Sequence, residues 1–453
     1  MKEQYYVGYN RQVITPDEPI PISGYSNEPQ RSMKAITEDI CITCLAITDW
    51  LDTTIMIVGM DFMRVNDYIG EKGRALIHNV TGIVEDHIFM CATHTHSSPG
   101  LDKEDWPEIR RYAQKVFEKM EQAAVAAMED RKPSNLFEGS VETKFLNFVK
   151  HYVCKDKLTG EYCIVGDCFG DETNKDILRH TTEVDPTLHV LQFKREGGKD
   201  VVVANFRAHP HFTGGVKKYD LSSDYPGAFR MVLEKMRECN ALFLQGACGN
   251  VNEKSRIGAE RTFQTCRSHA MALAAYTENC LSFRMKPVEP APIKTLQRVF
   301  YGPINHTMDH LAEEAWKIRS FWNETFDTKK AMEMAAPLGI RSVYHANAIK
   351  ANSERTDEDG KMILNAVQLG KELAFVTFPG ELFDTLGARV EDSSPYGRTL
   401  VLGYSHHHVG YLPSMVAYKY SCYETDITRF APGTGEKMAD THVDMLNELK
   451  NSN

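Results

Sequence analysis

The chain has 453 residues, 42% of them hydrophobic and 10% aromatic, which are the proportions of a globular protein with a full apolar core. Its 52 basic and 62 acidic side chains give a formal charge of −10. Because no basic cluster interrupts this acidity, nucleic acid and anionic membrane surfaces are excluded as expected partners. No apolar run approaches the ~20 residues that span a bilayer.

The cysteines and the first residues bear on the compartment. Eleven cysteines, an odd number scattered singly, are typical of reduced intracellular thiols rather than of a disulfide framework. The sequence opens without the apolar segment of a secretory signal. We therefore expect a cytoplasmic protein whose partner is a small-molecule substrate, with homo-oligomerisation left open.

Along the chain, short apolar runs alternate with helical patterns. Apolar residues that recur at three and four positions predict helices at 106–129, 225–238 and 260–278. This alternation predicts an α/β fold, a mixed β-sheet layered with helices. The strands, which are expected to be buried on both faces, are predicted at 53–60, 87–92, 187–193, 201–206, 241–245, 373–378 and 399–403.

Two segments depart from this alternation. Residues 155–179 contain several glycines and charges, and we expect a long loop near the functional site. Residues 304–340 include a long, charged helical stretch, which we expect to be an insertion in a single domain that spans 1–453. Such an insertion would act as a lid or dimer contact, or would simply pack on the sheet as a solvated helix.

Histidines stand at the ends of two predicted strands. The run Cys91-Ala92-Thr93-His94-Thr95-His96 places two imidazoles two residues apart, so on extended backbone both rings face one side and can approach one metal ion. The strand 201–206 ends in Arg207-Ala208-His209-Pro210-His211, where the proline stops the strand.

Two later strand ends also carry polar side chains. Phe378-Pro379-Gly380-Glu381 leads from an apolar strand to a carboxylate that opens a helical pattern, where the helix dipole by itself would favour an acid. Gly410-Tyr411-Leu412-Pro413 and Tyr423-Glu424 follow a strand and a histidine triplet. Tyrosines in such places are by default half-buried packing residues.

Taken in order, the His-x-His, His-Pro, Pro-Gly-Glu and Gly-Tyr-Leu-Pro motifs, with Tyr-Glu a dozen residues later, resemble the catalytic domain of the neutral ceramidases. The likeness runs from about Val7 to about Glu424, and residues 7–16, 22–25 and 244–252 agree with it. In that family one zinc ion is held by two histidines, a glutamate and a tyrosine. The resemblance therefore implies Zn²⁺ bound by His94, His209, Glu381 and Tyr411.

The resemblance also implies roles for residues around the metal. His96 would carry a proton beside the metal, and Tyr423 would stabilise the developing oxyanion. The family's serine, in a Gly-Asp-x-Ser-Pro stretch, is replaced here by Asn252, and we expect either Asn252 or loop amides to stabilise the oxyanion together with Tyr423. Because the chain ends at Asn453, we expect no counterpart of the family's C-terminal immunoglobulin-like domain.

Further polar residues near these motifs are expected to contact the substrate. Asp61 follows a strand and would either orient a ligating histidine or serve as a turn residue. His211 and His406 add hydrogen-bonding groups, and Lys150 falls, with its neighbour His151, near the position of an arginine of the ceramidase site. Cys248 lies on the loop that faces the site, but the sequence identifies no base that would make it a nucleophile.

These residues predict a zinc-dependent hydrolase. Water activated by the metal, with His96 or a nearby base as proton acceptor, would attack the amide of a polar N-acylated small molecule. Ester or lactone hydrolysis stays open, and because the serine is replaced so does metal-dependent cleavage of a sugar-like carbon–oxygen bond. The third alternative is a metal-binding pseudoenzyme without turnover.

Overall fold

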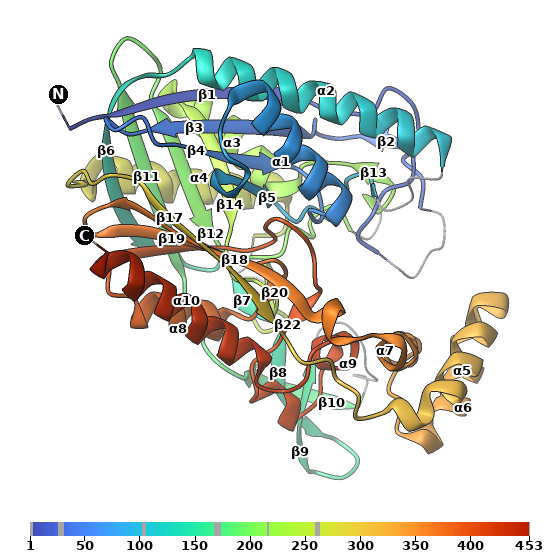
Figure 1. The fold of residues 1–453 in the computed structure, drawn as a ribbon. Coiled ribbons are helices and arrows are strands. Elements are labelled where there is room, and N and C mark those ends of the chain that lie inside the picture. The colour runs from blue at the N-terminus through green and yellow to red at the C-terminus, as the bar shows by residue number, and fades with distance from the viewer. Residues whose placement is uncertain are drawn as a thin grey trace.

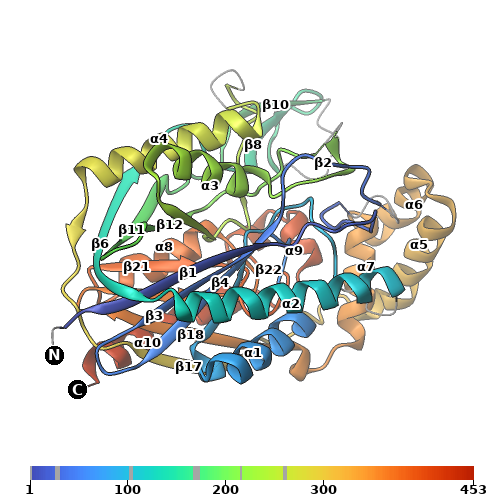
Figure 2. The same ribbon diagram turned by 90° about the horizontal axis from the view of Figure 1, so that it is seen from above.

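The computed structural model describes residues 3–25, 31–101, 106–166, 174–214, 217–258 and 263–452. Two β-sheets lie face to face, and helices cover the outer face of each. The layers therefore follow the order helix, sheet, sheet, helix (Figure 1, Figure 2). This arrangement confirms the predicted α/β fold of mixed sheet and helices.

The larger sheet is mixed. Its neighbours are mostly antiparallel, but the pairs β4–β5 and β12–β14 are parallel. The strand order is β14 (Asn240–Gln245), β12 (Val201–Phe206), β11 (Thr187–Arg195), β6 (Lys132–Glu142), β1 (Tyr5–Val13), β3 (Cys41–Thr48), β4 (Thr54–Met60) and β5 (Ile88–Ala92), with β16 (Lys286–Pro287) paired to β6.

The smaller sheet has four strands, and its last pair is parallel. Alternation along the strands explains why strands such as β3, β12 and β19 are buried on both faces, since successive side chains point to opposite sides. In β4, Ile57 packs toward Phe375 of the smaller sheet, whereas Val58 packs toward the helices. The order is β17 (Lys294–Tyr301), β18 (Lys361–Gly370), β19 (Leu373–Thr377) and β21 (Arg398–Leu402).

Three pairs of helices cover the sheets. α2 starts with a proline, which needs no hydrogen-bond partner at the first helical position, and α1 is capped by the side chain of Asn66. None of the described helices is both long and apolar enough to cross a membrane. The pairs are α1 (Asp67–Thr81) with α2 (Pro107–Glu129), α3 (Asp224–Arg237) with α4 (Cys266–Phe283), and α8 (Asp384–Ser393) with α10 (Thr434–Asn451).

The segment predicted as a long loop is instead a small antiparallel sheet of β8 (His151–Asp156), β9 (Tyr162–Gly166) and β10 (Lys175–His180). A tight turn makes this possible, because the Asp156 carboxylate accepts from two backbone amides and Gly160 adopts a φ of 75°. Residues 167–173 of the predicted loop lie outside the described part of the chain.

The charged stretch within 304–340 belongs to a helical lobe with its own apolar cluster. Figure 1 shows α5 (Ala312–Thr325) and α6 (Thr328–Ala335) projecting from one end of the molecule, and α7 (Val343–Glu354) joins them to the rest. The stretch is not one helix, because Phe326 adopts a φ of 54° and the Asp327 side chain caps α6. A role as lid or dimer contact stays a prediction.

The remaining short elements pair in twos. They are β2 (Ala35–Ile36) with β13 (Asp220–Leu221), β7 (Phe148–Val149) with β15 (Val251–Asn252), and β20 (Glu381–Leu382) with β22 (Tyr411–Leu412). The short helix α9 (Tyr423–Ile427) follows β22 in the chain.

Candidate metal centre

The predicted ligands come from strand ends of both sheets. His94 and His209 follow β5 and β12 of the larger sheet, Glu381 lies just after β19 of the smaller one, and Tyr411 lies further along the chain that leaves β21. Each of these strands belongs to a parallel pair. Ligand sites commonly form where the carboxyl ends of parallel strands meet a crevice, and this topology brings the four residues together.

Glu381 is held by a pair of very short strands. It lies in β20, directly opposite Tyr411 in β22, and α8 begins only at Asp384. It is therefore not a first-turn helix acid, which corrects the expectation from the helical pattern. The amide of Gly249 donates to the Leu382 carbonyl at 2.8 Å, so the loop after β14 is hydrogen-bonded to this pair of strands.

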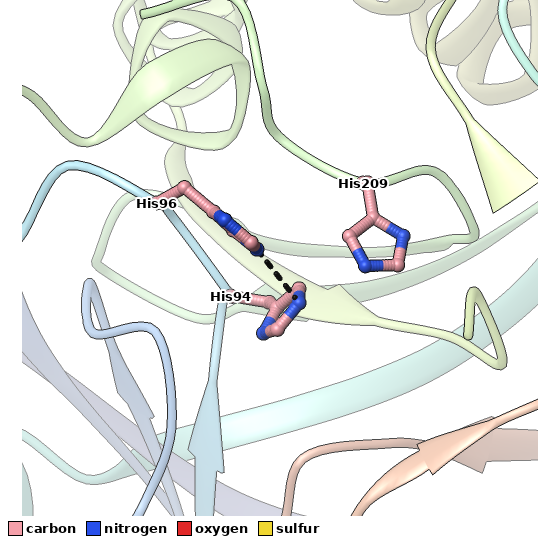
Figure 3. A group of neighbouring side chains, drawn as sticks. All are labelled: His94, His96 and His209. Atoms are coloured by element: carbon pink, nitrogen blue, oxygen red, sulfur yellow. Dashed lines mark hydrogen bonds between the residues drawn. The ribbon is translucent and has the colours of Figure 1, made fainter. Parts of the chain in front are cut away.

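Four side chains converge beside these strand ends. The Nε2 atoms of His94 and His209 lie 3.4 and 3.2 Å from Oε2 of Glu381. Nε2 of His96 lies 3.1 Å from that of His94 (Figure 3). His94, His96 and His209 each offer a ligand atom, and these atoms lie within 4.8 Å of one another. This is the spacing that ligands around a single metal ion adopt.

Backbone carbonyls fix the orientation of all three rings. The Nδ1 atoms of His94, His96 and His209 lie 2.6, 2.8 and 3.0 Å from the carbonyl oxygens of Met63, Gly24 and Val251 respectively. A carbonyl only accepts, so each Nδ1 carries the proton and each Nε2 turns a lone pair toward the centre. Second-sphere carbonyls orient metal-binding histidines in this way.

The donor set fits a divalent transition metal. Three imidazole lone pairs and a carboxylate that face one another repel, unless a cation lies between them. Imidazole nitrogen with carboxylate oxygen is a donor set that suits zinc. The ring of His94 also stacks on Tyr404 at 4.0 Å, and His94 adopts a φ of 68°, so its position is strongly constrained.

The electrostatics keep the donors in the forms that bind metal. Burial, reinforced by the charge of Lys150, lowers the pKa of His209 to about 4, and burial also lowers the pKa of His96 well below its usual value. Burial would raise the pKa of Glu381, but the adjoining His94 and His209 hold it well below its usual range. At neutral pH His96 and His209 are therefore neutral and the carboxylate is ionised.

A cavity of about 660 Å³ opens over this centre. Tyr411 and Tyr423 line it together with His94, His96 and Glu381, and the two tyrosine rings lie 5.9 Å apart. The structure thus brings the predicted oxyanion donor, Tyr423, to the same cavity as three of the predicted ligands, His94, Glu381 and Tyr411.

Three other predicted residues lie next to the centre. His211 is beside His96, with 3.3 Å between their Nε2 atoms. Asn252 lies in β15 and forms an isolated backbone bridge with His209, but it is not part of the cavity wall. Lys150 is buried, 2.8 Å from Glu424, and its ammonium lies over the Tyr411 ring. It therefore contacts protein groups rather than the cavity.

Asp61 and His406 are placed differently from expectation. The Asp61 carboxylate is buried against the Arg230 guanidinium at 2.9 Å, and the carbonyl of Met63, not Asp61, orients His94. His406 turns away from the cavity to Asn365, at 2.9 Å, because its φ of 65° breaks the alternation of an extended chain.

His408, the last residue of the same triplet, takes the place expected for His406. It lines the cavity, with Nε2 3.7 Å from Oε1 of Glu381. The sequence marked the triplet but not which ring reaches the site. Cys248 is fully buried with Sγ 3.0 Å from the Tyr404 hydroxyl, and burial raises its pKa, so it lacks the environment of a nucleophile.

Three arginines of the cavity wall were not predicted. Arg64, Arg355 and Arg429 are far apart in the sequence and carry no motif. Only the folded chain brings them together, so composition and spacing held no signal for them.

No protein-family model and no curated protein matches this sequence. Solved structures that are similar to the chain in fold include neutral ceramidase from Pseudomonas aeruginosa and a ceramidase in complex with C2. Each has a TM-score of 0.71 at 16% identity, over 99% of this chain and 75% or 76% of the other. The predicted resemblance is thereby confirmed at the level of structure, and the chain has a neutral ceramidase-like fold.

Proposed function

We propose that this protein is a zinc-dependent hydrolase that cleaves an amide bond in a polar N-acylated small molecule. The observation that carries the proposal is the convergence of three carbonyl-oriented imidazoles on Glu381 at the base of a cavity. The similar fold of solved ceramidases supports amide hydrolysis as the reaction class.

His94, His209 and Glu381 would hold the metal, with Tyr411 as a weak fourth ligand. When bound, Zn²⁺ would supply an acidified water and Lewis-acid polarisation of a carbonyl. The phenol of Tyr411 is suited to a site that changes its coordination, because it binds more weakly than imidazole or carboxylate. The protein fixes the other donors through the carbonyls of Met63 and Val251.

His96 is the proposed proton acceptor. Its Nδ1 proton is engaged by the Gly24 carbonyl, so Nε2 is the atom that can accept a proton at the centre. Because burial lowers its pKa, His96 is neutral at pH 7 and ready for that role. His211, 3.3 Å from it, would pass the proton onward.

Tyr423 is the proposed donor to the developing oxyanion. It is the first residue of α9, and the next residue, Glu424, is anchored by Lys150 at 2.8 Å and by His151 at 2.9 Å. This buried network sets where α9 begins, and so where the Tyr423 hydroxyl lies in the cavity. Lys150 therefore acts through Glu424 as a positioning residue.

The cellular setting belongs to the same proposal. Every described cysteine is a free thiol, and most of these thiols are buried. Reduced thiols are typical of proteins of the cytoplasm. This supports the proposal that the enzyme works there on a water-soluble substrate.

The first experiment is elemental analysis of the purified protein and of His94→Ala. We expect about one zinc ion per chain in the wild type and its loss in the variant, as a single tetrahedral site requires. His306→Ala, which removes an exposed histidine of the helical lobe, is the matched control and should retain the metal.

Substrates are then screened with product analysis by mass spectrometry. Release of an amine and a carboxylic acid from N-acyl compounds supports the proposal. Hydrolysis of esters or lactones only, or cleavage of a sugar-like carbon–oxygen bond, identifies one of the other reaction classes. Bound metal without turnover of any class of substrate contradicts the proposal that the protein is an enzyme and favours a metal-binding pseudoenzyme.

A further inference from the structure

One side of the cavity is lined by three cationic side chains. Arg64 lies between β4 and α1, Arg355 is the residue after α7, and Arg429 lies between α9 and α10. All three are half-buried. Asp67 is the one carboxylate that the described wall contains besides Glu381 at the metal centre. The wall is therefore cationic, although the whole chain carries a charge of −10.

Neutral groups accept from two of these guanidinium groups. Arg355 donates to the side-chain oxygen of Asn352, and Arg429 donates to the carbonyl of Asp359 at 3.1 Å. Within the described part of the chain, neither forms a salt bridge with a carboxylate. Both therefore retain N–H donors and a charge that a ligand in the cavity could use, since each guanidinium has five N–H groups.

The fold holds these cations together at an energetic cost. Burial and the nearby charge of Arg355 lower the pKa of Arg429 to about 10, and Arg64 acts in the same direction. Burial likewise lowers the pKa of Arg355, while the Asp359 carboxylate acts on both arginines in the opposite direction and Asp67 does so on Arg429. Half-buried like charges are destabilising unless something offsets them. An anion bound between them would add to the offset that these carboxylates provide.

The arginines also lie close to the metal centre. His408, whose Nε2 lies 3.7 Å from Oε1 of Glu381, lines the same cavity as Arg64, Arg355 and Arg429. The cationic wall and the metal centre therefore belong to one cavity, whose volume of about 660 Å³ suits a small molecule. A substrate that reaches the metal with one end can reach the arginines with the other.

Resting on the proposed function, we infer that the substrate carries an oxyanion group, a carboxylate or a phosphate, that binds to Arg64, Arg355 and Arg429 while its acyl amide lies at the metal centre. Guanidinium groups recognise both oxyanions through paired N–H···O bonds. The wall thus selects an anionic N-acylated molecule over a neutral one.

Binding to matched pairs of probes tests this inference directly. The pairs are N-acetylglycine with N-acetylglycinamide, and N-acetylethanolamine phosphate with N-acetylethanolamine. Calorimetry on the full chain, both as purified and after chelation, should show tighter binding of the anionic member of at least one pair. The pair that shows the larger preference identifies carboxylate or phosphate as the recognised group.

Variants assign that preference to the wall. In Arg429→Gln and Arg355→Gln the preference should fall about tenfold, the usual effect of losing one charge-assisted hydrogen bond. Arg298→Gln removes an arginine that pairs with Glu448 away from the cavity, and should leave the preference unchanged. Equal binding of both members, no binding of either anion, or a preference that survives when Arg355→Gln and Arg429→Gln are combined in one chain would overturn the inference.

The result is independent of hydrolysis. Anion binding that depends on the arginines, without cleavage of any N-acyl probe, supports the anion site and contradicts the proposed reaction. Cleavage of neutral and anionic members with equal KM and kcat supports the reaction and contradicts the anion site.

Discussion

At the scale of single residues, the proposed metal centre depends on the tautomers of its histidines. The carbonyls of Met63, Gly24 and Val251 hold the proton on Nδ1 of each ring, which leaves the Nε2 lone pairs for a metal. Substitutions of two proposed ligands and of the proposed oxyanion donor test the roles of single residues.

Glu381→Ala and His209→Ala should each lose the metal while the chain stays folded. Both side chains project from the ends of elements into the centre, so their removal creates no cavity in a sheet core. Even groups that only orient a ligand contribute about tenfold to a hundredfold in affinity, and a ligand should contribute more. Metal content and circular dichroism check this, and full metal occupancy in either variant would reject the ligand assignment.

Tyr423→Phe should keep the metal and lower kcat by roughly tenfold to a thousandfold, the range for loss of one oxyanion donor. The phenyl ring retains the packing on Tyr411, so only the hydroxyl is lost. Tyr162→Phe, a substitution at a tyrosine that is 72% exposed, is the control. Unchanged turnover in Tyr423→Phe would remove this residue from the mechanism.

At the scale of elements, the two-residue strands β20 and β22 position Glu381 and Tyr411 as a pair. Their close contact with the loop after β14 depends on glycine. A Cβ atom on Gly249 would lie 2.4 Å from the carbonyl oxygen of Glu381, a distance that backbone atoms cannot accommodate without moving.

Gly249→Ala should therefore displace β20 and weaken metal binding, although no ligand is changed. Overpacking of this kind typically costs about 1–3 kcal/mol in stability. Gly397→Ala is the control, because a Cβ there would make only ordinary contacts, the nearest at 3.5 Å. We expect lower metal occupancy in Gly249→Ala alone, and equal occupancy in both variants would show that β20 does not depend on this contact.

At the scale of the whole molecule, the four layers bury histidines far from the metal centre. His269 lies among aromatic rings of Phe212, Tyr225 and Phe263, and its ring nitrogens have no hydrogen-bond partner within the described ranges. Burial lowers the pKa of His269 to about 3 and that of His442 to about 4.

Acid should therefore destabilise the fold through these residues. Below the unfolded-state pKa of about 6.5, the unfolded chain binds protons that the folded chain excludes, so stability is complete above that pH and falls as pH drops toward the folded values. His269→Leu should remove about 2 kcal/mol of the stability difference between neutral pH and about pH 5. Thermal unfolding at both pH values measures this. If His269→Leu loses as much stability between the two pH values as the wild type, His269 does not contribute.

The sequence by itself determined that buried strands alternate with helices, and it supplied the four residues that we propose as metal ligands. Buried strands read as continuous apolar runs because both faces are covered, so 53–60 and 201–206 were recognised almost to the residue. The His-x-His and Pro-Gly-Glu motifs lie where strands end, and such local patterns can be recognised from the sequence without the fold. The short β-sheet at 151–180 was missed because its strands are short and mix charged with apolar residues, and because Gly160 in the turn between the first two is typical of a loop.

Only the tertiary structure decided which side chains share the cavity. His408 rather than His406 reaches Glu381, because a left-handed backbone conformation at His406 turns its ring away. Arg64, Arg355 and Arg429 meet although hundreds of residues separate the first from the others. Contacts between distant segments depend on how sheets and helices pack in three dimensions, and no local period in a sequence encodes that packing.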